Sequence, residues 1–226
     1  MKIALNAGFT CPNIDGTKGT GGCTYCSSSG SGDFAGNPSH GILMQFEEVK
    51  NRMHNKWHDA KYIPYFQAHT NTYAPADVLR ERFEPVLRQP NVVGISIATR
   101  ADCLKDDVLD YLCELNERTY LITELGLQTV FDETGEKINR CHTYAEFLDG
   151  YEKLKKRKIN VCVHLIDGLP GETKEMMVES ARQVAQLKPH CVKLHLLHVL
   201  KGTRIERELN EGKFELMTLE DYVDVI

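Results

Sequence analysis

The chain has no long hydrophobic run. No apolar segment of its 226 residues approaches the roughly 20 residues that a membrane-spanning helix requires. The first ten residues, MKIALNAGFT, carry one lysine and a short apolar stretch, which is not the pattern of an export signal. We therefore expect a cytoplasmic protein without a membrane segment, whose eight cysteines are mostly reduced thiols.

The sequence also has no excess of positive charge. Its 27 lysines and arginines are outnumbered by 32 aspartates and glutamates, for a formal net charge of −5. That balance argues against a strong grip on nucleic acid along the whole chain. A local exception is the run KLKKRK, residues 153–158, at the end of a predicted helix. We interpret it either as a solvated helix end, where cations suit the helix dipole, or as a contact for an RNA backbone.

Low-complexity linkers, compositional breaks and internal repeats are absent as well. With 42% hydrophobic and 26% charged residues, the chain has the composition of a globular protein with one large core. We therefore expect a single domain over residues 1–226. The last segment, FELMTLEDYVDVI, has a helical pattern without a stop signal, so we expect a chain truncated at its C-terminus.

What the sequence does contain is an alternation of strand-like and helix-like segments. Six segments have strand character, and five of them are rich in Val, Ile, Tyr or Phe: residues 2–7, 61–67, 91–98, 119–125, 159–166 and 190–199. Their spacing of about thirty residues is that of one strand–helix–strand unit, which predicts a parallel sheet with right-handed crossovers. The predicted fold class is therefore α/β, as a barrel or an open sheet.

Apolar stripes and capping signals predict helices between the strands. The stripes consist of Phe46, Val49, Met53 and Trp57 in one segment, and of Tyr144, Phe147, Leu148, Tyr151 and Leu154 in another. Thr143 and Glu146 have the spacing of a capping box. Thr173 is a predicted N-cap, and Pro189 predicts the end of the same helix.

The stretch CPNIDGTKGTGGCTYC places Cys11, Cys23 and Cys26 directly after the first predicted strand. Disulfides need pairs and a structural zinc site takes four protein ligands, so three thiols indicate a different ligand. An iron–sulfur cluster held by three thiolates keeps one iron with free coordination sites. Ligands of parallel sheets bind at the carboxyl ends of the strands, where these cysteines fall. The alternatives are a zinc site completed by His40 or Cys141, and thiols without a common ligand.

The other cysteines lie mostly among apolar residues, and we interpret them as core thiols. They are Cys103, Cys113, Cys141, Cys162 and Cys191.

The cysteine stretch resembles the motif of the radical S-adenosylmethionine superfamily. In its widened form it looks like that of the YhcC/YtqA-like branch, which is related to the catalytic subunit of Elongator and to the coproporphyrinogen dehydrogenases. The resemblance continues in the family's order through YFQAHTNTYAP, ATRADCL, ELGLQT, HLIDGLPGET and KLHLLHVLKGT.

This resemblance implies a partial (βα)6 TIM-like barrel with parallel strands. It also implies a [4Fe-4S] cluster that binds S-adenosylmethionine through its open iron. One electron, from a donor such as flavodoxin or ferredoxin, would cleave the sulfonium to a 5′-deoxyadenosyl radical, which abstracts a hydrogen atom from the substrate.

The resemblance further implies contacts to S-adenosylmethionine beyond the cluster. Gln128 and Arg140 are twelve positions apart, like a Gln and an Arg that touch this cofactor in the similar coproporphyrinogen dehydrogenases. His164 stands where that family has an Asp near the ribose. Glu124 precedes Gln128 by four along an extended segment, so both side chains point to one face. The Arg140 guanidinium suits a carboxylate, and an ion pair with Glu136 is the competing interpretation.

Three further positions are compared with the family pattern. Tyr25, between the last two cysteines, is expected either to pack near the adenine or to be structural. Where related enzymes carry a Gly-Gly-Glu stretch that holds the methionyl amino group, this chain reads QAHTNT at residues 67–72. Another residue must therefore supply that contact. Ala98 stands where Elongator-type sequences have Glu, so no ribose contact is transferred to it.

Kinship to Elongator implies an RNA substrate, such as the wobble uridine of tRNA. A radical enzyme for a small molecule and a non-catalytic iron–sulfur or zinc module are the alternatives. His164, His195 and His198 lie on the last two strands, where an isolated His is more often a hydrogen-bonded core residue than a catalyst. Lys193 and His195 share one strand face and would line the substrate cavity if that face is inward. The opposite face would then pack against helices through Val192, Leu194 and Leu196.

Overall fold

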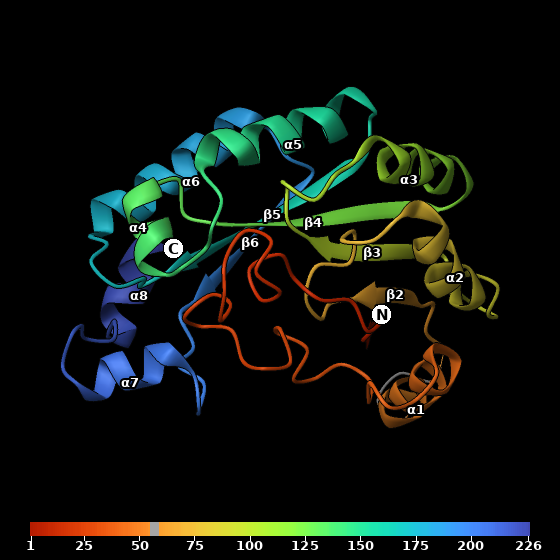
Figure 1. Ribbon diagram of the computed structural model, residues 1–226, viewed down its shortest axis with the longest axis horizontal. Helices are drawn as coiled ribbons and strands as arrows, with labels where there is room; N and C mark the ends of the chain where they lie inside the picture. Colours follow the sequence, from red (N-terminus) through yellow and green to blue (C-terminus); the bar gives the residue numbers. More distant parts are fainter. Residues whose placement is uncertain (55–58) are drawn as a thin grey trace.

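The six predicted strands all form in the computed structural model, which describes residues 1–54 and 59–226. They are β1 (Lys2–Leu5), β2 (Ile63–Phe66), β3 (Gly94–Thr99), β4 (Tyr120–Gln128), β5 (Asn160–Asp167) and β6 (Cys191–Leu196). They pair in sequence order as one parallel sheet, as predicted. The sheet curls into a half-barrel, with helices around its outer side and the long segment after β1 on its inner side (Figure 1). The fold is therefore α/β, of the partial TIM-barrel type.

Eight helices form within the described residues. They are α1 (Ile42–His54), α2 (Ala76–Leu87), α3 (Asp106–Arg118), α4 (Asp132–Lys137), α5 (Tyr144–Lys156), α6 (Lys174–Leu187), α7 (Arg204–Asn210) and α8 (Leu219–Val225). No helix of the described part of the chain is long and apolar enough to cross a membrane.

The predicted helix signals are confirmed where the structure describes them. In α1, Phe46 and Val49 are buried, whereas Trp57 of the same predicted stripe lies outside the described residues. Helix α5 begins with the full capping box of Thr143 and Glu146. In α6 the Thr173 side chain caps the first turn, and the helix ends at Leu187, just before Pro189.

The strands present one face to the helices and the other to the inside of the half-barrel. On β5, Val163 and Leu165 are buried in the hydrophobic core, where α5 and α6 pack against the strand. Each such side chain contributes about 1.5 to 3 kcal/mol to folding. Because neighbouring side chains on a strand alternate, His164 and Ile166 point inward, where they line a cavity.

The outer face of β6 differs from the prediction. Val192 and Leu194 are 41% and 43% exposed, so the expectation that they pack against helices is wrong. The physical reason is that β6 is the edge strand, and the preceding helix α6 packs on β5 instead. Leu196 is half-buried and lines the inner cavity. The edge position also leaves Cys191 exposed, so it is not the core thiol that we expected.

Candidate active site

The loop between β1 and α1, which carries the three clustered cysteines, is fastened to the segment between α4 and α5. Asn139 Nδ2 donates to Gly22 O at 2.7 Å, and Asn13 Nδ2 donates to Asn139 O in return. The Thr24 N–H donates to Ile138 O at 2.9 Å. These bonds hold the loop on both sides of its second cysteine, so the positions of the thiols are fixed by the fold.

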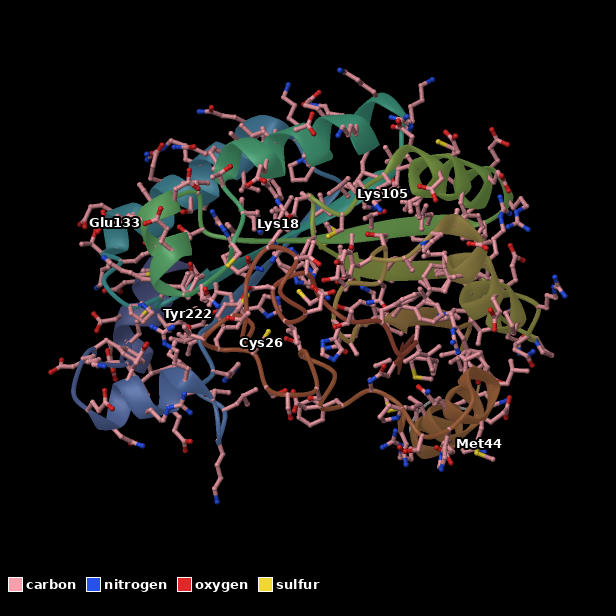
Figure 2. All side chains as sticks on the ribbon, in the orientation of Figure 1. Lys18, Cys26, Met44, Lys105, Glu133 and Tyr222 are labelled. Atoms are coloured by element: carbon pink, nitrogen blue, oxygen red, sulfur yellow. The ribbon has the colours of Figure 1, made fainter. Side chains whose placement is uncertain are left out.

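Two adjacent glycines let this loop turn back toward the sheet. Gly21 and Gly22 have φ angles of +79° and +74°, a region that other residues rarely adopt. After the turn, Cys23 and Cys26 line the same cavity as Cys11, and the cavity volume is about 370 Å³. Figure 2 shows Cys26 inside the arc formed by the helices.

The three thiols are free and line one cavity. None forms a disulfide. A hydrogen bond from Cys26 lowers the pKa of the Cys23 thiol to about 6, although burial opposes this shift. The same hydrogen bond, together with burial, raises the pKa of Cys26, so Cys23 is the thiol of this pair that ionises first. Thiolates are the metal-binding form.

The other predicted zinc ligands lie outside this cavity. His40 pairs with Glu48 at 2.9 Å and does not line the cavity. Cys141 is directed to the Asn139 side chain at 3.4 Å and packs against Gly19 of the loop. Neither residue completes a zinc site in this structure.

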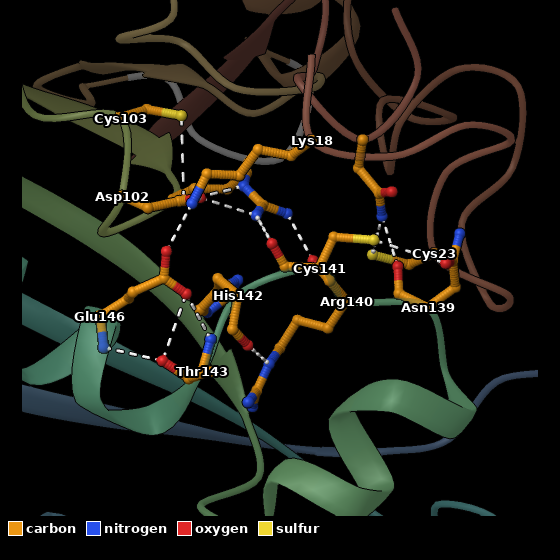
Figure 3. A network of polar contacts seen from close by, with 12 residues as sticks. Lys18, Cys23, Asp102, Cys103, Asn139, Arg140, Cys141, His142, Thr143 and Glu146 are labelled. Carbon is orange, nitrogen blue, oxygen red and sulfur yellow. Dashed lines mark hydrogen bonds and ion pairs between the residues drawn. The ribbon is translucent and has the colours of Figure 1, made fainter. Parts of the chain in front are cut away.

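An ion-pair network joins the cysteine loop to β3 and α5 (Figure 3). Arg100 donates twice to the Asp102 carboxylate at 2.9 Å and once to Arg140 O at 2.7 Å. Lys18, from the loop, pairs with Asp102 at 2.9 Å and with Glu146 of α5 at 2.6 Å. Burial opposes the shift, but the ion pairs with Arg100 and Lys18 lower the pKa of Asp102 to about 2. The network fixes the Arg100 guanidinium, whose positive charge helps to lower the pKa of Cys23.

Arg140 lines the cavity, but its guanidinium is bound by the chain itself. It is 1% exposed. It donates to three carbonyl oxygens and one carboxylate: His142 O at 2.8 Å, Leu127 O at 2.8 Å, Thr129 O at 2.6 Å and Asp132 Oδ1 at 3.0 Å. Only one of the five guanidinium N–H donors is left. A forked contact with the S-adenosylmethionine carboxylate, as the sequence suggested, does not fit this arrangement. Its acidic partner is Asp132 and not Glu136.

Glu124 is the polar centre of the inner face of the sheet. Its side chain is fully buried and accepts hydrogen bonds from four side chains: Lys2 Nζ, Ser96 Oγ, His164 Nε2 at 2.8 Å and Lys193 Nζ at 2.6 Å. Burial by itself would raise the pKa of Glu124, but these donors hold it well below its usual range. Glu124 and His164 are therefore bound to each other, and their expected contacts with S-adenosylmethionine would have to compete with these bonds.

The inner face of β6 agrees with the prediction from strand alternation. Lys193 and His195 both line the cavity. His195 Nε2 lies 3.4 Å from His164 Nδ1, which extends the Glu124 network across two strands. His198, just beyond β6, lines the same cavity.

Among the predicted cofactor residues, Gln128 has the side chain with the fewest hydrogen bonds to the rest of the chain. It lines the cavity together with Glu124, although a bulge between them interrupts the strand alternation from which a common face was predicted. A bulge between Gly126 and Gln128 places the Gln128 amide over Gly126, where an added Cβ would lie 2.5 Å from Nε2. The Gln128 side chain has no hydrogen-bond partner within residues 1–54 and 59–226.

Tyr25 lines the cavity beside the cysteines. Its hydroxyl contacts Cys23, and burial raises the pKa of Tyr25 well above its usual value. Its ring packs against a small apolar cluster that includes Ile138 and Leu169. Both predicted roles of Tyr25, structural and cofactor-facing, are compatible with this place.

Two histidines of the cavity were missed by the sequence reasoning. His142 is 7% exposed, and neither ring nitrogen has a partner in the described structure. Burial, together with Arg100 and Arg140, lowers its pKa to about 3. His69 lines the cavity where related sequences carry Gly-Gly-Glu, and burial lowers its pKa. The only sequence signal for either was its neighbourhood: His69 within QAHTNT and His142 two residues after Arg140.

The basic run, residues 153–158, lies at the end of α5, just before β5 begins. The cavity lies toward the opposite, carboxyl ends of the strands. Lys153 pairs with Asp149 at 2.6 Å, and Lys155 donates to Leu187 O at 3.0 Å. These contacts favour the interpretation as a solvated helix end.

Comparisons with known proteins match this geometry. A family model described as the Radical SAM superfamily matches residues 14–184, and one described as the Radical_SAM C-terminal domain matches residues 189–226. The chain is 57% identical to YtqA of Bacillus subtilis over 226 residues, which is the whole chain and 70% of that protein. It is 38% identical to YhcC of Escherichia coli K12 over 222 residues, covering 98% of the chain and 71% of that protein.

More distant similarities extend to proteins that act on tRNA by name. A tRNA uridine(34) acetyltransferase of Methanocaldococcus jannaschii is 26% identical over 137 residues, covering 59% of the chain and 25% of that protein. Among solved structures, Elp3 of Methanocaldococcus infernus has a TM-score of 0.71 at 17% identity, over 99% of the chain. Because the identity is this low, the likeness concerns the fold alone, and the chain spans 52% of that structure.

Proposed function

The chain belongs to the radical SAM superfamily, and on this basis we propose that it binds a [4Fe-4S] cluster through Cys11, Cys23 and Cys26 and cleaves S-adenosylmethionine reductively. The resemblance to the YhcC/YtqA-like branch is confirmed by the identities to both proteins. Membership makes the chain a radical SAM enzyme and implies S-adenosylmethionine and an iron–sulfur cluster. The observation that carries the proposal is the meeting of three reduced thiols on one cavity at the carboxyl end of a parallel sheet.

The residues present fit such a cluster. Three thiols on one cavity, with neither His40 nor Cys141 beside them as a fourth ligand, support an iron–sulfur cluster over a structural zinc ion. The lowered pKa of Cys23 supports binding as a thiolate. When bound, the cluster supplies the electron that cleaves the sulfonium, so that the adenosyl fragment removes a hydrogen atom from the substrate. A flavodoxin- or ferredoxin-type protein is the proposed electron donor.

The chain's own residues hold and shield the cofactor. Arg100 places its charge beside the thiolates, and Arg140 acts as a positioning residue because it fixes the backbone at Leu127 and Thr129. The free Gln128 amide is the proposed contact to the ribose, since an amide both donates and accepts. Tyr25 closes the cavity beside the cluster. Glu124 and His164 act indirectly, because the network on the inner face binds them to each other.

The departure from the Gly-Gly-Glu pattern has proposed replacements. Gln67 and His69 both line the cavity after β2, where that stretch is expected. We propose that these side chains take over the contact with the methionyl amino group.

The proposal is tested by anaerobic reconstitution with iron and sulfide, followed by an assay for 5′-deoxyadenosine in the presence of a reductant and S-adenosylmethionine. Four irons per chain and 5′-deoxyadenosine formation are expected. Bound zinc without cleavage would contradict the proposal and indicate a non-catalytic module.

For the substrate we propose tRNA, at a wobble uridine. The support is the similarity to a distant relative named as a tRNA uridine(34) acetyltransferase and to Elongator complex protein 3 of Homo sapiens, which is 26% identical over 140 residues. The same assay with and without bulk tRNA tests this part. Stimulation by tRNA is expected, and cleavage that tRNA leaves unchanged would favour a small-molecule substrate.

A further inference from the structure

The inner face of the sheet fixes the protonation of two histidines, and this bears on what the cavity binds. Glu124 is ionised, since two lysines and other donors surround its carboxylate. An ionised carboxylate only accepts hydrogen bonds. His164 Nε2, at 2.8 Å from Glu124 Oε2, must therefore carry the proton of that ring.

The same reasoning extends one ring further. With the proton on Nε2, a neutral His164 has an acceptor at Nδ1. His195 Nε2 lies 3.4 Å from this atom and must be the donor. In a neutral ring this leaves His195 Nδ1 as a lone pair. This atom has no partner within the described residues and is not sealed from solvent, and His195 lines the cavity.

The groups around His195 favour a neutral ring. Burial lowers the pKa of His195 to about 4, and His164, Lys193 and His198 add to this effect while Glu124 opposes it. The pKa of His164 is lowered by burial as well. Glu124 from β4 and Lys2 from β1 are the charged groups that face this pair from the other strands.

The cations of the cavity are bound to acceptors of the chain. Lys193 pairs with Glu124 at 2.6 Å and lies over the Tyr65 ring at 5.0 Å. Arg100 and Arg140 are held by carboxylates and carbonyl oxygens as described above. These three are the only lysines and arginines that line the cavity, so its described wall offers an anion no cation without an internal partner.

We infer that His195 Nδ1 is a hydrogen-bond acceptor for the substrate, so that the part of the substrate held there carries an uncharged donor such as a hydroxyl, an amide or a heterocyclic N–H. This inference rests on the proposed function, since it concerns the substrate of that same cavity. A carboxylate or a phosphodiester at this place would bring its oxygen lone pairs against the lone pair of His195 Nδ1, which is unfavourable because neither group donates a hydrogen bond.

The test is nitrogen NMR of histidine side chains in the reconstituted full chain with its cluster oxidised. At pH 7 we expect His164 and His195 both neutral and both protonated on Nε2. A charged His195, or a proton on its Nδ1, would overturn the inference. His164→Phe should release His195 into a mixture of both neutral forms, whereas His198→Gln, which removes no hydrogen bond of the network, should leave the His195 proton on Nε2 at pH 7.

Two probes of equal size then test the recognition itself. Acetamide has a hydrogen-bond donor and acetate has none. Acetamide should therefore shift the His195 Nδ1 signal in a saturable way, and acetate should bind at least about ten-fold more weakly. Equal responses to the two probes, a tighter response to acetate, or a saturable shift by S-adenosylmethionine alone would overturn the inference. A sample that binds acetamide at His195 but forms no 5′-deoxyadenosine would count against the proposed function alone.

Discussion

Single buried side chains decide how much of the cavity is left for ligands. Arg140, Glu124 and His164 line the cavity and still direct their polar atoms to partners within the chain. Gln128 lines it with a free amide. The difference lies in charge and hydrogen bonding, because a buried charge that loses its partners costs several kcal/mol, whereas the partly exposed, uncharged Gln128 amide costs less. Residues of one predicted set therefore have two different roles.

Arg140→Lys and Gln128→Ala should separate these roles. Lysine cannot reach the carbonyl oxygens of Leu127, Thr129 and His142 together, so Arg140→Lys should lower the free energy of unfolding by roughly 2 to 4 kcal/mol. Gln128→Ala should leave stability nearly unchanged and weaken S-adenosylmethionine binding by about two- to ten-fold. Urea denaturation and isothermal titration measure the two effects. A stable Arg140→Lys with weakened cofactor binding would restore the direct contact that the sequence suggested.

At the scale of elements, the position of α5 against the loop after β3 decides how Arg100 and Asp102 are held. Gly150 of α5 packs on this loop so closely that an added Cβ would lie 2.2 Å from Ala101 O. The loop and the helix are also joined through the ion pairs of Lys18. This close approach fixes the ion-pair network of Arg100, Asp102 and Lys18 relative to the cysteines.

Gly150→Ala is therefore expected to be destabilising although alanine is the better helix former. The methyl group meets backbone that cannot give way, and overpacking of this kind costs roughly 1 to 3 kcal/mol. Thermal or urea unfolding measures the change. Gly41→Ala is the matched control, since an added Cβ there meets nothing within 4 Å. Equal stability of the two variants would show that α5 does not press on this loop.

The end of α5 gives a second prediction at this scale. Because Lys153 and Lys155 have local partners and residues 153–158 lie away from the cavity, replacing Lys155, Lys156 and Lys158 by Ala should leave tRNA binding and its salt dependence unchanged. Filter binding over a range of salt concentrations measures this. A slope that falls by about one for each removed lysine would show that these residues contact phosphates after all.

The elements themselves could be predicted from the sequence more completely than the site. The six strands and the caps at Thr143 and Thr173 follow from local patterns, which one sequence displays. The exposed outer face of β6 could not be foreseen, because only the packing shows that α6 covers β5. The bonds of Arg140 were hidden for a similar reason: three of its acceptors are carbonyl oxygens, which every residue carries. The link from Glu124 to His195 needs the register of three strands.

For the whole molecule, buried neutral histidines and a paired carboxylate predict how stability depends on pH. The pKa of His142 is lowered to about 3, mainly by burial, against about 6.5 in an unfolded chain. Below pH 6.5 the unfolded chain then binds the extra proton, so stability is lost as pH falls, by up to about 1.4 kcal/mol per unit. Asp102, whose ion pairs lower its pKa to about 2 from the usual 3.8, adds a loss of stability as pH falls between those values.

Urea unfolding of the metal-free chain at pH 7, 6 and 5 measures this slope. His142→Gln should reduce the slope by about one proton, because glutamine does not titrate. An unchanged slope in this variant would show that His142 is not buried as a neutral ring.

The most direct test of the proposed site is the iron and sulfide content, measured together with 5′-deoxyadenosine formation, in the wild-type chain and two variants after anaerobic reconstitution. Cys23→Ala should lose most of the cluster and all cleavage of S-adenosylmethionine, because it removes the thiol with the lowered pKa. Cys191→Ala, a change at an exposed thiol that does not line the cavity, should keep both. Full cluster content and full cleavage in Cys23→Ala would contradict the assignment of the three cysteines.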